Sequence, residues 1–510
     1  MMDTPHRGWS TGQWIIVVLV LLAGAGFAWH LRATEVTTGG DEATQVILAE
    51  SLRHGRYHSE FLPGTPRHTM YPPGQAAWLA VISVVAGPGP TPVRIASIGL
   101  LMLTALLVGD GLRRVAGAWA GILGLLATAW NERLLLIAGT GLPESLFMSG
   151  AVLACWAALR ADDSRDRRLT ILASAASLVS VMARLAGVTA VGAIGAWLLL
   201  RRRWRAAALH AAVSGLVVGG WALYAALGRQ DSLISYANDL ERVGQRHGLL
   251  PQVLANAVAY LRIAVGEVLT VPSVPGTALD NVAALLLLAS CAAAGLLSLA
   301  RRWPSLLLYL SSSVVMLLVW PYPLARLLSP VVPAVVALLL VGAAVLGRRL
   351  PGQGRNLFLA VVALGITLPG LTRVLAQPRE HDWYQATLEA TRGQLPAGTI
   401  VAAMKPPVVY YFAGYQSTDL NTFIRDLMPG QPPFPSPSGA GVLLLGRKNP
   451  GELERVAPRL EPYCRSLEVR LQLHPTVLLL GPRAPAAQDD ACAALAAYRA
   501  APLAGPPRWP

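Results

Sequence analysis

Apolar segments about as long as a membrane is thick recur through the first three quarters of this chain. A helix needs about 20 predominantly apolar residues to cross the hydrocarbon core of a bilayer. The sequence of 510 residues is 54% hydrophobic with a mean hydropathy of +0.48, which is too apolar for a soluble protein of this size. We therefore expect a mainly α-helical, polytopic membrane protein with about 11 transmembrane helices. The expected spans are 14–31, 94–112, 116–135, 143–160, 169–184, 186–200, 206–227, 278–299, 304–320, 327–347 and 356–373.

The placement of arginine predicts the orientation of these spans. The net charge of +14 comes almost entirely from arginine, because Lys405 and Lys448 are the only lysines. Positive residues prefer the cytoplasmic side of short loops, and with the N-terminus inside, 11 spans put every basic cluster in the cytoplasm. The charge therefore indicates membrane orientation, and we expect no nucleic-acid partner. These clusters are 113–114, 160–168, 201–205, 301–302 and 348–349.

Two segments decide whether this topology holds. Residues 74–87 are apolar but only 14 long, so we interpret them as a re-entrant or interfacial helix, although a span remains the alternative. Residues 169–200 must form two short helices with Arg184 near the outer turn between them. The first span has no small-residue cleavage site and is interpreted as retained. We expect a multi-pass protein of the bacterial inner membrane, with a cytoplasmic N-terminus and an extracytoplasmic C-terminal domain.

The sequence predicts two domains. Residues 1–375 form the membrane domain, with a first outer loop at 32–93 that contains an amphipathic helix near 43–54, and a second outer loop at 228–277. Residues 376–510 form a small α/β domain with a polar helix near 382–394 and strands at 399–403, 407–413, 441–446, 466–473 and 476–481. Cys464 and Cys492 lie in this external domain, where the alternatives are a disulfide and two free thiols.

Four local patterns lie on the outer side in this topology. Asp41 and Glu42 follow two glycines about a dozen residues after the first span. The other three patterns are Arg67 to Gly74, Gly141 to Phe147, and Arg326 to Pro333. In this order, and with the external tail that begins near Val401, they resemble the GT-C membrane glycosyltransferases, particularly the bacterial protein-O-mannosyltransferase and aminoarabinose-transferase type (glycosyltransferase family 39-like). The resemblance covers essentially the whole chain.

The resemblance implies transfer of a hexose or pentose from a polyprenyl-phosphate donor in the lipid bilayer to an acceptor glycan, lipid or protein on the outer face. Asp41 would be the base that takes the acceptor proton in an inverting reaction. Glu144 would be the second acidic residue of the catalytic site. Arginine suits the leaving phosphate because it stays charged and binds phosphate through two nitrogens. The residues that would bind donor phosphate are Arg326, Arg184, Arg67 and His68, and those that would line the site are Glu42 and Tyr71.

Plainer interpretations remain for these residues. Asp41 could be a helix N-cap, with Glu42 stabilising the first turn. Glu144 could be a solvated interfacial residue, and Arg326 could extend to the membrane interface. Tyr71 stands where aminoarabinose transferases have a lysine before the two prolines, which weakens the assignment of that donor sugar.

Other functions also remain open from the sequence. No cofactor is firmly predicted, but His54, His58 and His68 share a loop with the two carboxylates, which leaves a divalent metal site open. A transporter or flippase for a lipid-linked sugar is the main alternative function, and a membrane scaffold with an external binding domain is a third. A transporter would place its ionisable groups near the middle of the membrane.

Overall fold

The computed structural model describes residues 8–33, 36–37, 39–228, 249–268, 278–320, 323–351, 353–376, 383–425, 434, 440–446, 456–474, 477–483 and 491–500. The chain forms two compact units. Unit 1 consists of Met1–Thr34 and Thr69–Pro378, and unit 2 of Glu35–His68 and Arg379–Trp509. The boundary near residue 378 lies close to the expected one, but the contacts group residues 35–68 with the C-terminal residues, which the sequence analysis did not anticipate.

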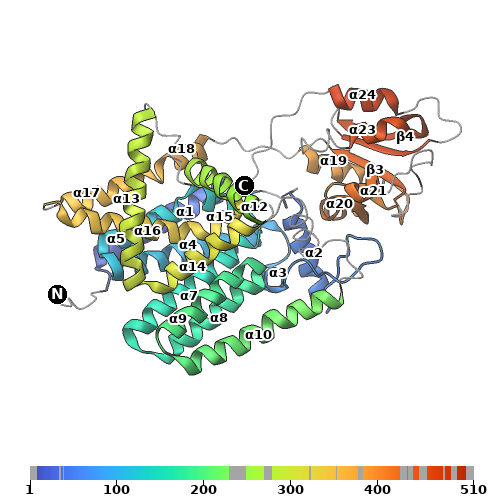
Figure 1. Cartoon of the computed structure of the whole chain (residues 1–510). Coiled ribbons are helices and arrows are strands. Elements are labelled where there is room, and N and C mark those ends of the chain that lie inside the picture. The colour runs from blue at the N-terminus through green and yellow to red at the C-terminus, as the bar shows by residue number, and fades with distance from the viewer. Residues whose placement is uncertain are drawn as a thin grey trace. The chain divides into compact units, whose positions relative to one another are not determined.

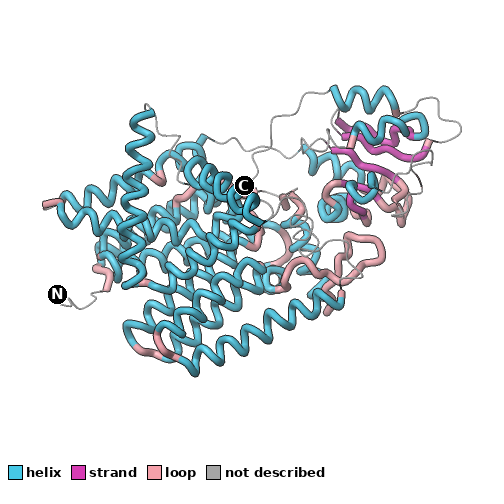
Figure 2. Tube along the Cα trace, viewed as in Figure 1, coloured by secondary structure: helices cyan, strands magenta, loops and turns pink. Residues whose placement is uncertain are grey.

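Unit 1 is a bundle of helices (Figures 1 and 2). Each of the 11 segments expected to span the membrane contains a helix. The elements of unit 1 are α1 (Thr11–His30), α3 (Gly74–Ala86), α4 (Pro90–Ala116), α5 (Ala118–Ala129), α6 (Glu132–Ala138), α7 (Glu144–Ser164), α8 (Arg167–Ala183), η1 (Leu185–Gly187), α9 (Val188–Leu200), α10 (Trp204–Leu227), α12 (Leu249–Ile263), η2 (Ala264–Val268), α13 (Ala278–Arg302), α14 (Pro304–Val319), α15 (Ala325–Leu328), η4 (Ser329–Val331), α16 (Val332–Leu346), η5 (Gly347–Arg349), α17 (Gly354–Gly365) and α18 (Leu368–Ala376).

Among the described residues, six helices are long and apolar enough to cross a membrane, or seven if α5 and α6, which are bent by 55°, form one broken span. The mainly α, polytopic membrane fold is therefore confirmed, while the count of 11 spans stays a prediction. Helix α3 has 13 residues, which at 1.5 Å per residue is too short to cross the hydrocarbon core alone. Residues 229–248 and 269–277 of the second outer loop lie outside the described residues.

Helices α7 and α8 pack closely along their lengths. A side chain at Gly150 would lie 3.0 Å from the carbonyl oxygen of Ala176, so glycine is needed for the two backbones to approach. Helix α8 ends at Ala183, and α9 begins after the short turn η1. The prediction of two short helices with Arg184 at the turn is confirmed, since Arg184 is the C-cap of α8.

The predicted cytoplasmic arginine clusters gather at one end of unit 1. Arg114 at the end of α4 pairs with Asp163 at the end of α7, with 3.3 Å between Nη1 and Oδ2. Arg302 at the end of α13 donates to the carbonyl oxygen of Val115 at 2.7 Å. Clusters far apart in the sequence thus share one end of the bundle, as the positive-inside pattern requires.

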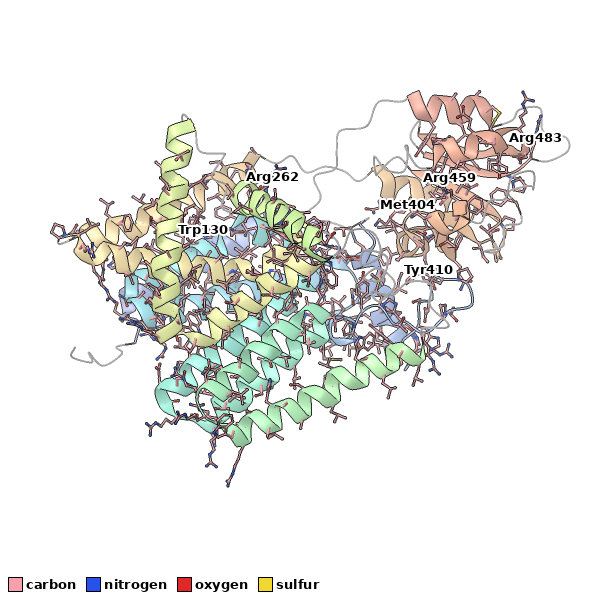
Figure 3. The ribbon with its side chains drawn as sticks, in the orientation of Figure 1. Trp130, Arg262, Met404, Tyr410, Arg459 and Arg483 are labelled. Atoms are coloured by element: carbon pink, nitrogen blue, oxygen red, sulfur yellow. A yellow bond between two sulfur atoms is a disulfide. The ribbon has the colours of Figure 1, made fainter. Side chains whose placement is uncertain are left out.

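The core of unit 1 also contains polar anchors for its helices. The indole nitrogen of Trp130, labelled in Figure 3, donates to the carbonyl oxygen of Val20 at 3.0 Å and ties α5 to α1. Trp303 is fully buried and donates to the carbonyl oxygen of Cys155 at 2.9 Å, which fixes the start of α14 against α7. Such bonds satisfy buried polar groups that would otherwise be costly in an apolar setting.

Unit 2 contains a five-stranded mixed sheet with strand order β2-β1-β3-β5-β4 (Figure 2). Strand β1 pairs in parallel with β2 and β3, whereas β5 pairs antiparallel with β3 and β4. The elements of unit 2 are α2 (Asp41–Arg53), α19 (Trp383–Thr391), β1 (Val401–Ala403), α20 (Pro406–Ala413), β2 (Ser417–Asp419), α21 (Leu420–Arg425), β3 (Val442–Gly446), α23 (Ala457–Leu460), η6 (Glu461–Ser466), β4 (Leu467–His474), β5 (Val477–Pro482) and α24 (Cys492–Ala500).

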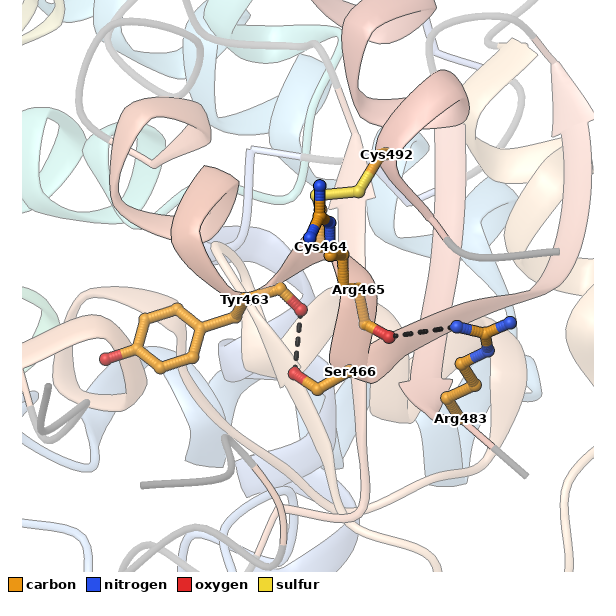
Figure 4. The surroundings of a disulfide bond; sticks show 6 residues. All are labelled: Tyr463, Cys464, Arg465, Ser466, Arg483 and Cys492. Atoms are coloured by element: carbon orange, nitrogen blue, oxygen red, sulfur yellow. Dashed lines mark hydrogen bonds between the residues drawn. A yellow bond between two sulfur atoms is a disulfide. The ribbon is translucent and has the colours of Figure 1, made fainter. Parts of the chain in front are cut away.

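The prediction of one strand in the C-terminal domain, at residues 407–413, is wrong. Residues 407–413 form the helix α20 instead, because Pro406 stands in its first turn and Gly414 ends it with a φ of 81°. Proline fits the first turn of a helix, and a left-handed glycine is a common helix end. The strand β2 was not predicted. Cys464 and Cys492 form a disulfide between η6 and the start of α24 (Figure 4), which is the pair that the sequence analysis identified.

Residues of the first outer loop belong to the core of unit 2. Val36 and Ala43 are buried with Val401 of β1 and Val408 of α20. The backbone also joins the two segments, since the amide of Ser417 donates to the carbonyl oxygen of Phe61 at 2.8 Å. The first outer loop is thus a structural part of the C-terminal unit, which explains why its short amphipathic helix α2 is stable.

Candidate functional site

A buried ion pair joins the end of α8 to the start of α7 in unit 1. Glu144 is the first residue of α7 and is 1% exposed, and Arg184 donates to its Oε1 from Nη1. Each charge also lies at the favourable end of a helix dipole, with the carboxylate at an N-terminus and the guanidinium at a C-terminus. Two sequence candidates 40 residues apart are therefore brought together.

One further element lies near Arg184, and another packs against that element. The positive charge of Arg184 acts on Tyr260 of α12, and Tyr260 hydrogen bonds to the backbone of Leu324 just before α15. Arg326 lies two residues further along, on α15, and α12 packs against α15. We call Glu144, Arg184, Tyr260 and Arg326 the polar cluster of unit 1.

Glycines at two turns allow the polar cluster to form. A side chain at Gly74 would lie 2.5 Å from the carbonyl carbon of Met182, so the start of α3 presses directly on the backbone that precedes Arg184. A side chain at Gly187 would lie 2.3 Å from the carbonyl carbon of Ser180, which is why the turn η1 can fold back on α8. Tyr71, 9% exposed, precedes α3 in the same unit.

The polar cluster lies at the opposite end of α7 from the gathered arginine clusters. Glu144 begins α7, whereas Asp163, which pairs with Arg114, stands in its last turn. A 21-residue helix separates the two by about 30 Å, the thickness of a hydrocarbon core. Glu144 and its partner Arg184 therefore lie at one end of α7 rather than at its middle.

Asp41 and Glu42 begin α2 in unit 2 and have different surroundings. Glu42 is 1% exposed, and its Oε2 accepts a hydrogen bond from the amide of Thr37 at 2.9 Å. Asp41 is partly exposed. The N-cap of α2 is Gly40 with a φ of 99°, so the interpretation of Asp41 as an N-cap is wrong. Glu42 holds the chain that leads into the helix, which leaves Asp41 as the first helical residue.

Lys405 was missed by the sequence analysis. It is the N-cap residue of α20, and a side chain built on Gly40 would lie 3.2 Å from its Cδ. Lys405 therefore lies against the turn that presents Asp41. Its rarity was the available signal, since a chain with 42 basic residues has only two lysines.

Two other candidates of the first outer loop have structural surroundings. His68 is 4% exposed, its Nδ1 lies 2.9 Å from Oγ of Ser59, and burial lowers its pKa to about 3. It is therefore neutral near pH 7 and does not supply charge for a phosphate. Arg67 is exposed and pairs through its backbone with His58 in an isolated bridge.

The histidines of this loop are not gathered around a common centre. The Nδ1 atoms of His54 and His58 lie 3.0 Å and 2.9 Å from the carbonyl oxygens of Glu50 and Thr65. Within the part of the chain that the structure describes, no group of three His, Cys, Asp or Glu side chains is placed to hold a metal ion.

Comparisons with known proteins identify the fold. No family model matches the chain, and no curated protein sequence matches it. ArnT from Cupriavidus metallidurans, in a structure bound to undecaprenyl phosphate, is 15% identical with a TM-score of 0.57, and the match covers 93% of this chain and 99% of ArnT.

Two other solved structures are similar over most of this chain. The oligosaccharyltransferase of Archaeoglobus fulgidus, in complex with Zn and sulfate, is 14% identical with a TM-score of 0.58, over 86% of this chain and 69% of that protein. The mycobacterial arabinofuranosyltransferase AftD is 14% identical with a TM-score of 0.51, over 94% of this chain and 40% of that protein. The chain has the fold of the GT-C membrane glycosyltransferases.

Proposed function

We propose that this protein is a membrane glycosyltransferase that moves a sugar from a polyprenyl-phosphate carrier to an acceptor on the extracytoplasmic side. The observation that carries the proposal is the buried Glu144–Arg184 pair, which lies near Tyr260 of α12 at one end of a bundle with the GT-C fold. Burying two charges costs several kcal/mol per ion before their attraction is counted. Use of the arginine in binding an anion would explain why the pair is kept.

The polar cluster suits the phosphate of the donor. Glu144 accepts a hydrogen bond from Arg184 and thereby fixes its direction, and a guanidinium carries five N–H donors, enough to serve a phosphate as well as a carboxylate. Arg326 adds a second positive charge from α15. As the sugar leaves, negative charge grows on the phosphate oxygen, and two fixed arginines stabilise that charge more strongly than water does. Arg67 stays a weaker candidate for this role because it is exposed.

Asp41 is our candidate for the base. The acceptor oxygen attacks the anomeric carbon, the bond from that carbon to the phosphate oxygen breaks, and the carrier phosphate leaves with the electron pair. Asp41 takes the acceptor proton, and the configuration at the anomeric carbon inverts. The turn at Gly40 and the hydrogen bond from Thr37 to Glu42 fix the backbone that carries Asp41. Glu144 would act by orienting Arg184 rather than by taking a proton.

The topology supports the extracytoplasmic side as the side of reaction. The gathered arginines predict a cytoplasmic end for α4, α7 and α13, and the polar cluster lies at the other end of α7. We therefore place the C-terminal unit outside the cytoplasm of a bacterium, where its disulfide is stable. The transferred sugar is a hexose or a pentose, and the acceptor is a glycan, a lipid or a protein.

Radiolabelled transfer tests the proposal. Membranes from cells that express wild type, Asp41→Asn or Glu50→Gln would be supplied with polyprenyl-phosphate sugars, and labelled product would be measured at equal expression. Glu50 is the control because it is an exposed carboxylate on the same helix, paired with Arg53. We expect product with wild type and Glu50→Gln and at least a hundredfold less with Asp41→Asn, within the usual range for a general base of about 10²–10⁴.

Two outcomes would contradict the proposal. Near-normal transfer by Asp41→Asn would remove Asp41 as the base. Labelled carrier that crosses the bilayer without any transferred product would favour the transporter, the alternative that the sequence left open.

A further inference from the structure

Neutral polar atoms on the elements that pack against α7 and α8, which carry the Glu144–Arg184 pair, are not used by the proposed phosphate site. Gln75, Ser145 and Ser329 are 2%, 1% and 1% exposed. Oε1 of Gln75 and Oγ of both serines have no hydrogen-bond partner within the described residues. Buried polar atoms in native proteins are nearly always hydrogen-bonded, because an unsatisfied one loses its bonds to water and gains nothing in return. Their concentration at one end of the bundle therefore points to a bound ligand.

Contacts on both sides fix Gln75 next to the ion pair. It follows Gly74, which presses on the backbone of Met182 just before Arg184. Its Nε2 donates to the carbonyl oxygen of Gly141 at 2.9 Å, three residues before Glu144. That bond assigns the two ends of the amide, since only the nitrogen can donate to a carbonyl oxygen. Oε1 is thus held in place as a buried acceptor without a donor.

The charges of the polar cluster restrict what kind of donor Oε1 can meet. Arg184 and Arg326 carry two positive charges and Glu144 one negative charge, which leaves a net charge of +1. The carboxylate of Glu144 is already paired with Arg184. One phosphodiester would balance the cluster, but a cationic amino sugar would bring a further positive charge, which only Oε2 of the carboxylate already shared with Arg184 could receive.

We propose that Oε1 of Gln75 accepts a hydrogen bond from a hydroxyl of the donor sugar, and that this sugar is uncharged. The inference rests on the proposed function, because it assumes that a carrier phosphate binds the polar cluster. It makes Gln75 a determinant of sugar specificity and assigns it no part in the chemical step. The hydroxyls of Ser145 and Ser329 are available to the same ligand, as donors or acceptors.

Binding measurements on the full-length protein in nanodiscs test this inference. The probes are undecaprenyl phosphate, undecaprenyl phosphate that carries mannose, and undecaprenyl phosphate that carries an amino sugar. The variants are wild type, Gln75→Met, which keeps the size but removes the acceptor, and Gln353→Met as a matched control. Gln353 is an exposed N-cap residue of α17.

We expect wild type and Gln353→Met to bind the mannose carrier at least as tightly as bare carrier and to bind the amino-sugar carrier more weakly. In Gln75→Met the affinity for the mannose carrier should fall about tenfold, the effect of one lost hydrogen bond in a buried site. Its affinity for bare undecaprenyl phosphate should stay within about twofold, because the phosphate does not contact Gln75 in this arrangement.

The remaining results would overturn the inference in distinguishable ways. Equal losses for the bare and mannose carriers in Gln75→Met would make Gln75 a structural residue and leave the proposed function intact. Tightest binding of the amino-sugar carrier by wild type would refute the argument from charge. Failure of wild type to bind any of the three carriers would overturn the proposed function, and this inference with it.

Discussion

Replacing Glu144 and Arg184 singly and together separates the cost of burying the pair from the use of its charge. Glu144→Gln leaves the guanidinium buried without its carboxylate, and Arg184→Met leaves the carboxylate buried without its guanidinium. Loss of one partner from a buried pair destabilises a protein by about 3–5 kcal/mol, because a charge remains that water cannot reach. The double variant contains no charge at either position.

The magnitudes follow from the burial of the two groups. The side chains of Glu144 and Arg184 are 1% and 10% exposed, so neither single variant can recover much solvation. In the double variant the pair becomes a neutral amide and an apolar side chain of similar size. Replacement of a whole buried pair is often neutral. We therefore expect the double variant to lie within about 1–2 kcal/mol of wild type, which gives a coupling energy of at least about 4 kcal/mol between the two residues.

Two measurements on the same nanodisc samples complete the test. Denaturant unfolding followed by tryptophan fluorescence gives the free energies of unfolding, and titration with undecaprenyl phosphate gives the affinity. The double variant should regain stability and still bind the carrier at least about tenfold more weakly than wild type, since a charged hydrogen bond contributes about 1.5–3 kcal/mol. If the double variant is stable and binds normally, the pair is structural and the phosphate assignment of Arg184 is refuted.

Three further predictions concern the two units separately. Gly74→Ala should destabilise unit 1 by about 2–3 kcal/mol and abolish transfer, because the new methyl group would lie 2.5 Å from the backbone of Met182. The control Gly99→Ala has open space around it and should be neutral or slightly stabilising in thermal unfolding. The pKa of His68 is about 3 in the folded protein and 6.5 in the unfolded chain. Between these two pH values only the unfolded chain binds a proton at this residue. Stability of unit 2 should therefore be full above pH 6.5 and fall by up to about 1.4 kcal/mol per pH unit below it, as measured by hydrogen exchange, and His68→Gln should flatten that slope. The double variant Cys464→Ser, Cys492→Ser should lower the free energy of unfolding of unit 2 by about 3–4 kcal/mol, because the disulfide closes a loop of 28 residues. Unchanged protection of unit 2 in hydrogen exchange would contradict this prediction.

The sequence predicted most of the membrane bundle because two simple signals agreed. Apolar segments gave the helices, and the side preference of arginine forced the break at Arg184 where length alone did not. The same topology put Glu144 and Arg184 on one side of the membrane. It could not pair them, since a contact across 40 residues depends on how α7 and α8 pack.

The C-terminal unit was predicted less well because its segments are short. Residues 407–413 fit a buried strand and a buried helix equally well by their apolar pattern, and the decisive signals were Pro406 and Pro407 at the start of the segment and Gly414 after it. The role of the first outer loop was missed for a different reason. Its burial against β1 and α20 is a contact between segments more than 300 residues apart, which no local pattern reports.

Gln75 shows why the specificity of such a site is harder to predict than its charge. An arginine in an apolar chain is conspicuous, because its burial needs an explanation. A glutamine beside a glycine at the start of a short apolar helix looks like ordinary helix-end polarity. It becomes informative only when the structure reveals that its nitrogen is bonded to Gly141 and its oxygen is buried without a partner among the described residues. The charged residues of this fold can thus be proposed from sequence as phosphate ligands, whereas the sugar specificity that we propose rests on neutral atoms whose bonding only the packed structure can reveal.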